Sequence, residues 1–295
     1  MNIYKNIREN IFKTWLLIFL IFVFIVLIGF ILSFVFNSRA ILYLAIIFGL
    51  FMNFISYFWS DKLVIAMVGA QKIEKKDFPE LWNIVENLSL TAGIPMPKIY
   101  IWKTNALNAF ATGRNYKNSA IVVTSAILNV LNKQELEGVI AHEISHIKNR
   151  DILVGTVAAV LVSVISLIGD FTLRSFWFSS DRDRNINPIV FILAIIGLIL
   201  SPIFAQLIQL AISRQREFLA DSSGVLLTRY PEGLANALLK ISQNPTVSAP
   251  QSFSHLFIAN PFKADQRTKK TPWYIKIWLT HPPIEERIKR ILGRV

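Results

Sequence analysis

Two long uncharged hydrophobic segments near the N-terminus limit what this chain of 295 residues can fold into. Trp15 to Phe36 is 22 residues without a charge, and Ala40 to Trp59 adds 20 more. At ~1.5 Å per helical residue, each can cross a hydrocarbon layer of ~30 Å. The first run is too long for the apolar core of a cleavable signal peptide, and no small-x-small cleavage site precedes Arg39. The sequence therefore predicts a membrane protein whose residues 1–60 form a hairpin of two spans, about 15–36 and 40–59.

Two further apolar segments are shorter or carry polar residues. Residues 152–169 reach the lower limit for a span, and residues 189–212 include Pro202, Gln206 and Gln209. A second membrane hairpin over 152–212 is the prediction, which gives four spans in all. A re-entrant or partly buried hairpin would have a similar pattern.

Charge and cysteine content narrow the class further. The net charge is +12, and the basic surplus lies at the N-terminus, in 61–151 and after residue 213, where 13 Lys and Arg stand against 6 Asp and Glu. Four spans place these three segments on the cytoplasmic side of a cell (inner) membrane, as the positive-inside rule requires. The surplus then reflects contact with a lipid bilayer, and no nucleic-acid motif accompanies it. The absence of cysteine excludes disulfides and any Cys-based metal or nucleophilic chemistry.

Between the two hydrophobic pairs lies the sequence His142-Glu-Ile-Ser-His146. Asn132 and Glu135 form a capping-box pattern that predicts a helix through this motif. A spacing of four residues puts both histidines on one helical face, where they can bind a single zinc ion. Glu143 is then placed to act as the general base. The alternative is a pair of solvated histidines on an amphipathic helix.

A catalytic zinc site needs a third protein ligand, and Glu217 is the predicted one. It lies 71 residues after His146, and the midpoint falls in the polar loop 181–184. A symmetric membrane hairpin would therefore return Glu217 to the height of His146. Asp221, one turn later, is predicted to orient a ligand histidine. The competing interpretation makes both acids ordinary surface residues of a helix.

The segments before the motif predict a small β-sheet. Asp77 and Glu80 suggest a capped helix that ends at Gly93, and residues 98–103 and 120–124 have strand patterns. Residues 108–113 are either an exposed edge strand with room for a substrate backbone or an inner strand of the sheet. The functional interpretation makes Asn108, Ala109, Phe110 and Ala111 substrate-binding residues.

The C-terminal part carries fewer signals. A short amphipathic helix is expected over 231–244, whereas 246–271 lacks periodicity. His281 precedes two prolines and a final helix that bears Arg287. His281 either faces the zinc cleft or is a capping or surface histidine.

Taken together, these residues resemble the HtpX-like membrane metalloproteases, relatives of the CAAX prenyl proteases. The resemblance rests on Asn108 to Gly113, the His142 to His146 motif followed by Asn149-Arg-Asp151, the run Glu217 to Asp221, and His281-Pro-Pro with Arg287. It implies one Zn²⁺ per chain, and cleavage of misfolded or damaged membrane proteins or unfolded polypeptides. It also implies a catalytic role for His281 and a place for Arg287 near the oxyanion side of the site.

The predicted fold class is α+β, a mainly helical membrane protein with a zincin-type catalytic domain. That domain is divided between 61–151 and 213–295 by the second membrane hairpin. Three alternatives share part of this pattern. A CAAX-type prenyl-protein endopeptidase would have the same site, and an intramembrane protease would bury the motif in a span. A membrane adaptor or chaperone would lack proteolysis, which an intact Glu143 with three ligands argues against.

Overall fold

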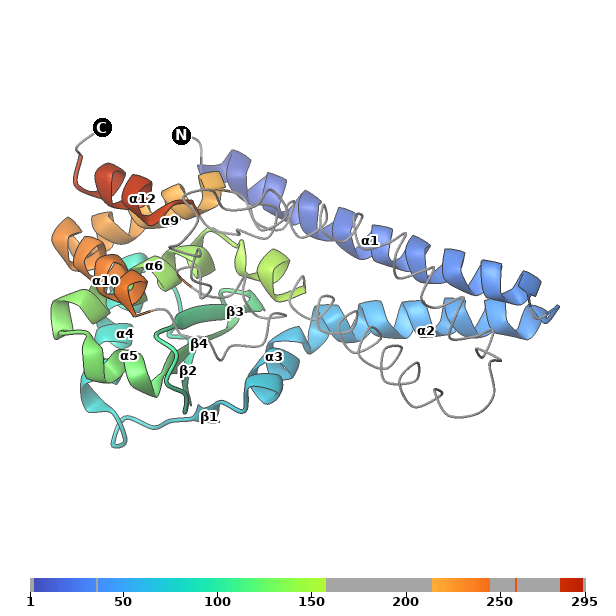
Figure 1. The fold of residues 1–295 in the computed structure, drawn as a ribbon, viewed down its shortest axis with the longest axis horizontal. Coiled ribbons are helices and arrows are strands. Elements are labelled where there is room, and N and C mark those ends of the chain that lie inside the picture. Colours follow the sequence, from blue (N-terminus) through green and yellow to red (C-terminus); the bar gives the residue numbers. More distant parts are fainter. Residues whose placement is uncertain (1–2, 36, 158–213, 245–257, 259–281, 294–295) are drawn as a thin grey trace, which may run out of the picture.

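A helical hairpin projects from a compact helix-and-sheet body (Figure 1). The structure is a computed structural model and describes residues 3–35, 37–157, 214–244, 258 and 282–293. The hairpin consists of α1 (Ile3–Val35) and α2 (Arg39–Phe58), which pack along each other. Both contain a stretch long and apolar enough to cross a membrane, 27 residues in α1 and 20 in α2. They correspond to the first two predicted spans.

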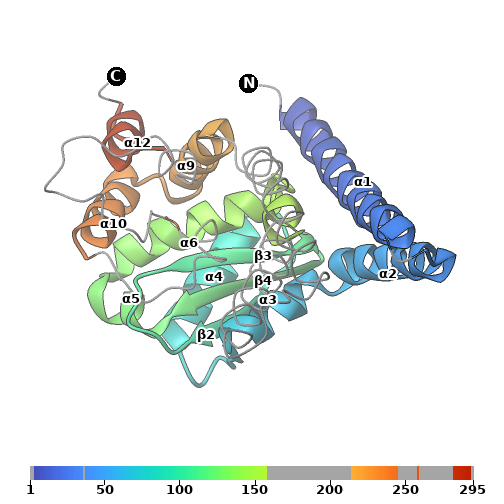
Figure 2. The same cartoon turned by 45° about the vertical axis from the view of Figure 1, so that its right-hand side comes forward.

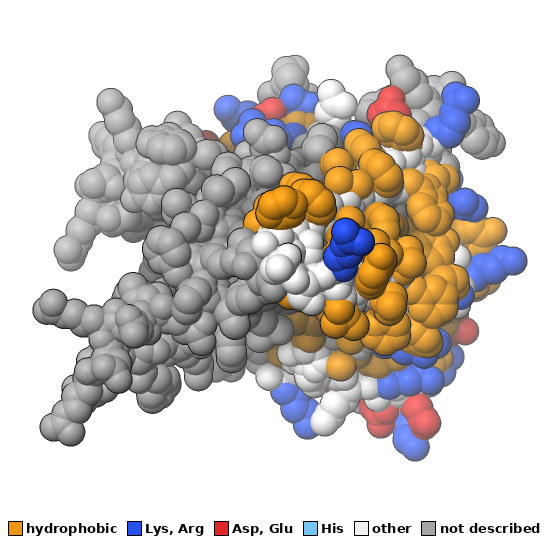
Figure 3. All heavy atoms as spheres, turned by 90° about the vertical axis from the view of Figure 1, so that its right-hand side faces the viewer, with side chains coloured by type: hydrophobic (Ala, Val, Ile, Leu, Met, Phe, Trp, Pro, Cys, Tyr) orange, Lys and Arg blue, Asp and Glu red, His pale blue; other side chains and the backbone are white. Residues whose placement is uncertain are grey.

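The hairpin exposes an unusual amount of apolar surface. Seen from the end toward which it points, the described part of the molecule is dominated by hydrophobic side chains (Figure 3). Phe34 is 79% exposed, and the large side chains of α2 that are at least half exposed are Tyr43, Leu44, Ile47, Phe48, Leu50, Phe51 and Phe54. Surface of this kind is stable in contact with lipid rather than water. The exposed apolar surface of these two helices therefore supports the prediction that the chain is a membrane protein.

The second predicted hairpin lies almost wholly outside the described residues. Only its beginning is described, as a helix over 152–157 directly after the motif helix. The total of four spans thus remains a prediction.

The body combines a four-stranded sheet with helices from both ends of the chain (Figure 2). Its first elements are α3 (Ser60–Val68), β1 (Gln71–Lys72), α4 (Pro79–Ala92), β2 (Lys98–Trp102), β3 (Ala109–Asn115), β4 (Asn118–Thr124), α5 (Ser125–Val130) and α6 (Lys133–Lys148). The later ones are α9 (Arg214–Thr228), α10 (Pro231–Gln243) and α12 (Ile284–Ile291). The mixture of helices with a small sheet agrees with the predicted α+β class.

Strand order in the sheet is β1-β2-β4-β3, so β3 lies at an edge. β4 pairs in parallel with β2 and antiparallel with β3. Alternate residues of a strand face opposite sides of a sheet. Ile121 and Val123 accordingly join the main core with α4, α6 and α10, whereas Phe110 and Val122 pack with α3 on the other side.

Two local expectations need correction. The helix after Asp77 has Phe78 as its N-cap and no side-chain cap, because Asp77 instead accepts a hydrogen bond from the Glu74 N–H in the preceding turn (2.8 Å). Residues 109–113 do form an edge strand, but it is not exposed, since every side chain in this stretch is buried. The two faces of the sheet are both covered there by helices.

Candidate metal centre and active site

The helix that carries the motif is fixed at its start by the predicted capping box. The Asn132 side chain accepts from the Glu135 N–H, and the Glu135 carboxylate accepts from the Asn132 N–H, both at 2.9 Å. Lys240 of α10 adds an ion pair of 2.7 Å to the same carboxylate. These contacts satisfy N–H groups that a helix start leaves unpaired and tie α6 to α10.

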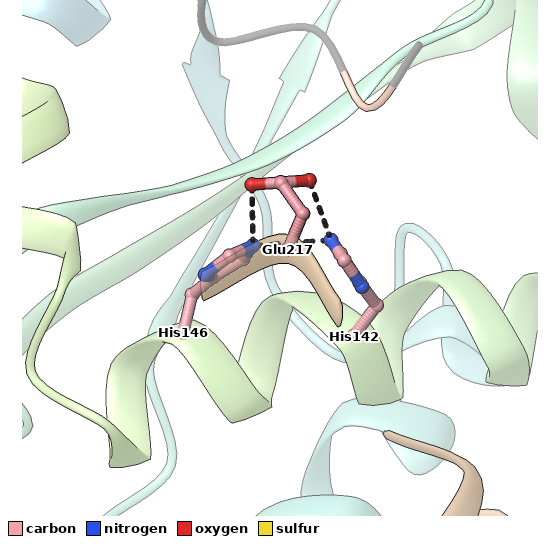
Figure 4. Close-up of side chains that lie close together, drawn as sticks. All are labelled: His142, His146 and Glu217. Atoms are coloured by element: carbon pink, nitrogen blue, oxygen red, sulfur yellow. Dashed lines mark hydrogen bonds and ion pairs between the residues drawn. The ribbon is translucent and has the colours of Figure 1, made fainter. Parts of the chain in front are cut away.

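His142 and His146 point from α6 toward Glu217 of α9 (Figure 4). The two Nε2 atoms are 3.0 Å apart, and the Glu217 oxygens lie 3.8 Å from that of His142 and 3.6 Å from that of His146. Two nitrogens bound tetrahedrally to zinc at ~2.0–2.1 Å would be about 3.3 Å apart, so the spacing fits such an ion. The three ligand atoms lie within 4.8 Å of one another and form a possible metal site.

Each histidine also has an acidic neighbour at its other ring nitrogen. His146 Nδ1 is 3.0 Å from Asp151 Oδ2, and His142 Nδ1 is 2.9 Å from Asp221 Oδ1. The second contact has the distance of a hydrogen bond but a poor angle, since the ring N–H is not aimed at the oxygen. An acid at Nδ1 favours the proton there and leaves Nε2 free for a metal. The surroundings of both rings therefore suit metal ligation.

Burial and charge shift the pKa values of these groups in opposite directions. Burial lowers the pKa of His142. It would lower that of His146 too, but the carboxylates of Asp151, Glu217 and Glu143 together outweigh it and raise the pKa to about 10. Burial would raise the pKa of Asp221, yet Arg287 and His142 hold it below its usual value. Asp221 is therefore a charged partner for its histidine.

Arg287 connects the last helix to this cluster. Its guanidinium is fully buried and donates to both oxygens of Asp221, from Nε (2.9 Å) and from NH2 (2.7 Å). NH1 donates to the Ile258 carbonyl at 2.7 Å and lies 3.8 Å from Glu217 Oε2. The described contacts thus place Arg287 behind Asp221, where it fixes the partner of His142. His281 lies outside the described residues, so its role stays a prediction.

Glu143 lies between the metal cluster and the sheet edge. Its Oε2 accepts a hydrogen bond from the Ala111 N–H at 2.8 Å. Burial, opposed in part by His146 and assisted by Glu217, raises the pKa of Glu143 to about 7. A carboxyl group with this pKa can both accept and donate a proton near neutral pH.

The predicted substrate strand lies beside Glu143, but its four residues differ in placement. The N–H groups of Ala111 and, two residues on, Gly113 point away from β4, toward Glu143 and Thr156. Backbone groups alternate along an antiparallel pair, so Ala109 also faces the free edge and Phe110 faces β4. Asn108 is fully buried, and its Oδ1 accepts from the Ile258 N–H at 3.0 Å.

A close helix contact sets the distance between the two ligand-bearing helices. A Cβ added at Gly224 of α9 would stand 3.0 Å from the His142 nitrogen and 3.2 Å from the Ala141 carbonyl carbon. Both neighbours are backbone atoms of α6, which cannot move out of the way alone. Glycine at this position lets α9 bring Glu217 and Asp221 against His142.

Asp151 was named in the resemblance, as part of Asn149-Arg-Asp151, but no role was assigned to it. The feature that could have indicated its role is its sequence position. Asp151 follows His146 by five residues and therefore lies just past the end of α6, close to the motif. Ile258 was not singled out from the sequence, yet its peptide links Arg287 to Asn108. No pattern in the surrounding segment pointed to that residue.

Comparison with known proteins gives concordant similarities. The sequence profile of peptidase family M48 matches residues 75–295. A protein named "Protease HtpX homolog" from Dictyoglomus turgidum is 43% identical over 294 residues, which cover 98% of this chain and 93% of that protein. Its namesake from Thermoanaerobacter pseudethanolicus is 44% identical over 300 residues, covering 98% and 97%. The one from Pyrococcus furiosus is 45% identical over 247 residues, covering 82% of each chain.

A solved structure of similar fold is Ste24p of S. mikatae. The TM-score is 0.52 at 19% identity, and the match covers 98% of this chain and 67% of that one. At this identity the similarity is one of fold.

Proposed function

The chain belongs to peptidase family M48, and we propose that it is a zinc-dependent endopeptidase that cleaves misfolded or damaged membrane proteins at the cytoplasmic face of the cell membrane. The family and the HtpX-named relatives make it a membrane metalloprotease. The choice of zinc, the substrate class and the side of the membrane are the proposed parts. The observation that carries the proposal is the convergence of His142, His146 and Glu217 beside Glu143.

Two nitrogens and one carboxylate oxygen form the ligand set that catalytic zinc sites use. When bound, zinc would supply a Lewis acid that acidifies a water molecule and polarises the scissile carbonyl. His142 and His146 would hold it through Nε2, since Asp221 and Asp151 occupy the Nδ1 sides. Glu217 would provide the third ligand and balance part of its charge.

Glu143 is assigned the proton transfer. Its carboxylate takes the proton of the attacking water and delivers it to the nitrogen of the leaving amine. Before substrate binds, the hydrogen bond from Ala111 keeps Oε2 at the sheet edge, close to where the scissile peptide would lie.

The edge of β3 supports an extended polypeptide as substrate. Ala109 and Ala111 are buried, but their backbone groups face away from β4, the direction in which a strand of any sequence would pair after displacing Glu143 from the Ala111 N–H. A chain that is unfolded or damaged exposes such segments, whereas a folded one does not. The apolar hairpin of α1 and α2 would hold the site at the bilayer, close to membrane-protein substrates.

Hydrolysis by the purified, detergent-solubilised full chain tests the proposal. We expect it to digest casein and an unfolded membrane protein, to stop with a chelator, and to recover with zinc. Glu143→Gln should keep zinc but lose about 10²–10⁴-fold of the rate, because only the base is removed. Near-normal turnover by this variant with full zinc would contradict the assigned role.

The same assay separates the alternatives. Preferential cleavage of a prenylated tetrapeptide would favour the CAAX-type activity, and no hydrolysis by the zinc-loaded chain would favour an adaptor or chaperone.

A further inference from the structure

In the part of the chain that the structure describes, no strand pairs with the outer edge of β3, yet this edge is not open along its whole length. Outward N–H groups occur at every second residue, and those of Ala111 and Gly113 already have partners. At Ala111 the partner is Glu143, and at Gly113 it is Thr156. These two partners differ in how easily a substrate can displace them.

Thr156 belongs to the helix that follows the motif and is fully buried. Its hydroxyl donates to the Ile152 carbonyl at 2.7 Å, lies 3.0 Å from the Thr112 hydroxyl and accepts from the Gly113 N–H at 3.3 Å. A hydroxyl has one donor and two acceptor positions, so these three contacts use all of them. The bond to the Ile152 carbonyl, four residues earlier, selects one of the two χ1 rotamers that a threonine adopts in a helix. Thr156 is therefore a fixed part of the edge.

A substrate strand that paired with Gly113 would need the hydrogen-bonding position now occupied by the Thr156 hydroxyl. A substrate carbonyl oxygen would have to lie about 2.9 Å from the Gly113 nitrogen, along the same N–H direction. Glu143 occupies the corresponding place at Ala111, but it has rotatable bonds and takes part in the reaction. The edge is thus exchangeable at Ala111 and closed at Gly113.

We propose that Thr156 ends the substrate-binding edge of β3 and so limits how many substrate residues can pair on one side of the scissile bond. This inference rests on the proposed peptidase function. Gly113 lies two residues beyond Ala111, where Glu143 marks the reaction centre, and a strand advances ~3.3 Å per residue. On the Gly113 side there is room for about two substrate residues, of which the one opposite Ala111 can pair with the β3 backbone.

The limited side follows from strand direction. Antiparallel pairing is slightly more stable per residue than parallel pairing, so the substrate is expected to run opposite to β3. Its N-terminal residues then lie toward Gly113 and its C-terminal residues toward Ala109. The limit falls on the N-terminal side of the cleaved bond.

A peptide-length series tests this limit. Peptides share one cleaved bond and extend from one to five residues on its N-terminal side, and kcat/KM is measured with the zinc-loaded full chain in detergent. Affinity for the Glu143→Gln protein is measured for the same peptides, so that the result does not depend on turnover. The first two residues together should improve both quantities by about 3- to 10-fold, because backbone pairing occurs at every second residue and only the one opposite Ala111 gains hydrogen bonds. The third to fifth should change them less than about twofold.

Two variants assign the limit to Thr156. Thr156→Ala removes the hydroxyl and the methyl group and frees the Gly113 N–H, so a third residue should now improve affinity. Ser89→Ala is the matched control, because Ser89 is a buried helical hydroxyl that bonds the Val85 carbonyl four residues earlier on α4, away from β3. It should keep the two-residue limit.

Continued gains beyond the second residue in the wild-type chain would overturn the proposal. So would a limit that Thr156→Ala leaves unchanged, or a failure of the Glu143→Gln protein to bind any peptide of the series. If the wild-type chain binds the peptides with the expected length limit but does not hydrolyse them, the result contradicts the peptidase function and leaves the role of Thr156 standing.

Discussion

Arg287 holds Asp221 with two hydrogen bonds, and Asp221 lies 2.9 Å from Nδ1 of the ligand His142. Arg287 comes from α12 and Asp221 from α9, so the last described helix of the chain is joined directly to the metal site. Both side chains are buried, which makes each the main counter-charge of the other.

Arg287→Gln should therefore weaken both the fold and the metal site. Removing one partner of a buried ion pair costs about 3–5 kcal/mol of unfolding free energy. Metal affinity should fall about 10–100-fold, because Asp221 is no longer oriented toward His142. Thermal unfolding and competition with a chelator measure the two effects. Lys289→Gln, an exposed change on the same helix, is the control and should alter neither.

Asp151→Asn tests the acid that was part of the sequence resemblance but had no predicted role. The change keeps the shape of the side chain but removes the charge beside His146 Nδ1. Metal affinity should fall about 10–100-fold, as for other groups that orient a metal ligand. Asp221→Asn should act in the same way through His142. Unchanged affinity in both variants would show that the acids do not orient the ligands.

Gly224→Ala tests the close approach of α9 to α6. The added methyl group meets backbone atoms at 3.0–3.2 Å, so α9 must shift away from His142. We expect a loss of about 1–3 kcal/mol in unfolding free energy and weaker metal binding. Gly155→Ala is the control, since a Cβ there meets no atom of the described residues within 4 Å. It should be neutral or stabilising by up to about 1 kcal/mol.

Asn10→Leu tests whether the first membrane helix supports the site. Buried Asn10 of α1 donates to the Asn149 carbonyl at 3.4 Å, in the short connection that leads to Asp151. Loss of this contact should loosen Asp151 and lower metal affinity several-fold. Asn53→Leu is the matched control, because Asn53 of α2 donates to the Ile18 carbonyl within the hairpin, at 3.2 Å. Equal effects of the two changes on metal affinity would contradict a specific role for Asn10.

Features that depend on local sequence were predictable. The capping box at Asn132 and Glu135 and the closing glycine of α4 at Gly93 both occur as the residue patterns indicate. Pairing Glu217 with His146 required a long-range argument. It assumed that a membrane hairpin between them would bring the chain back to the side and depth of the membrane at which it left. The structure does bring these two residues within 3.6 Å.

Other features were not accessible because several arrangements satisfy the same sequence. Asp77 can cap a helix or a preceding turn, and here its carboxylate pairs with the Glu74 N–H. Whether β3 is covered depends on how α3 and α6 pack, which no pattern within 108–113 records. The link from Arg287 through Ile258 to Asn108 uses a backbone peptide, and a peptide carries no residue signature.

The central claim is that His142, His146 and Glu217 together hold one catalytic zinc ion. Its most direct test is the zinc content of the purified full chain and of Glu217→Ala, measured by elemental analysis after dialysis against a weak chelator. The account predicts one zinc per wild-type chain and nearly none in the variant, because two histidines alone leave a catalytic site one protein ligand short. A Glu217→Ala protein that keeps one zinc per chain would contradict it.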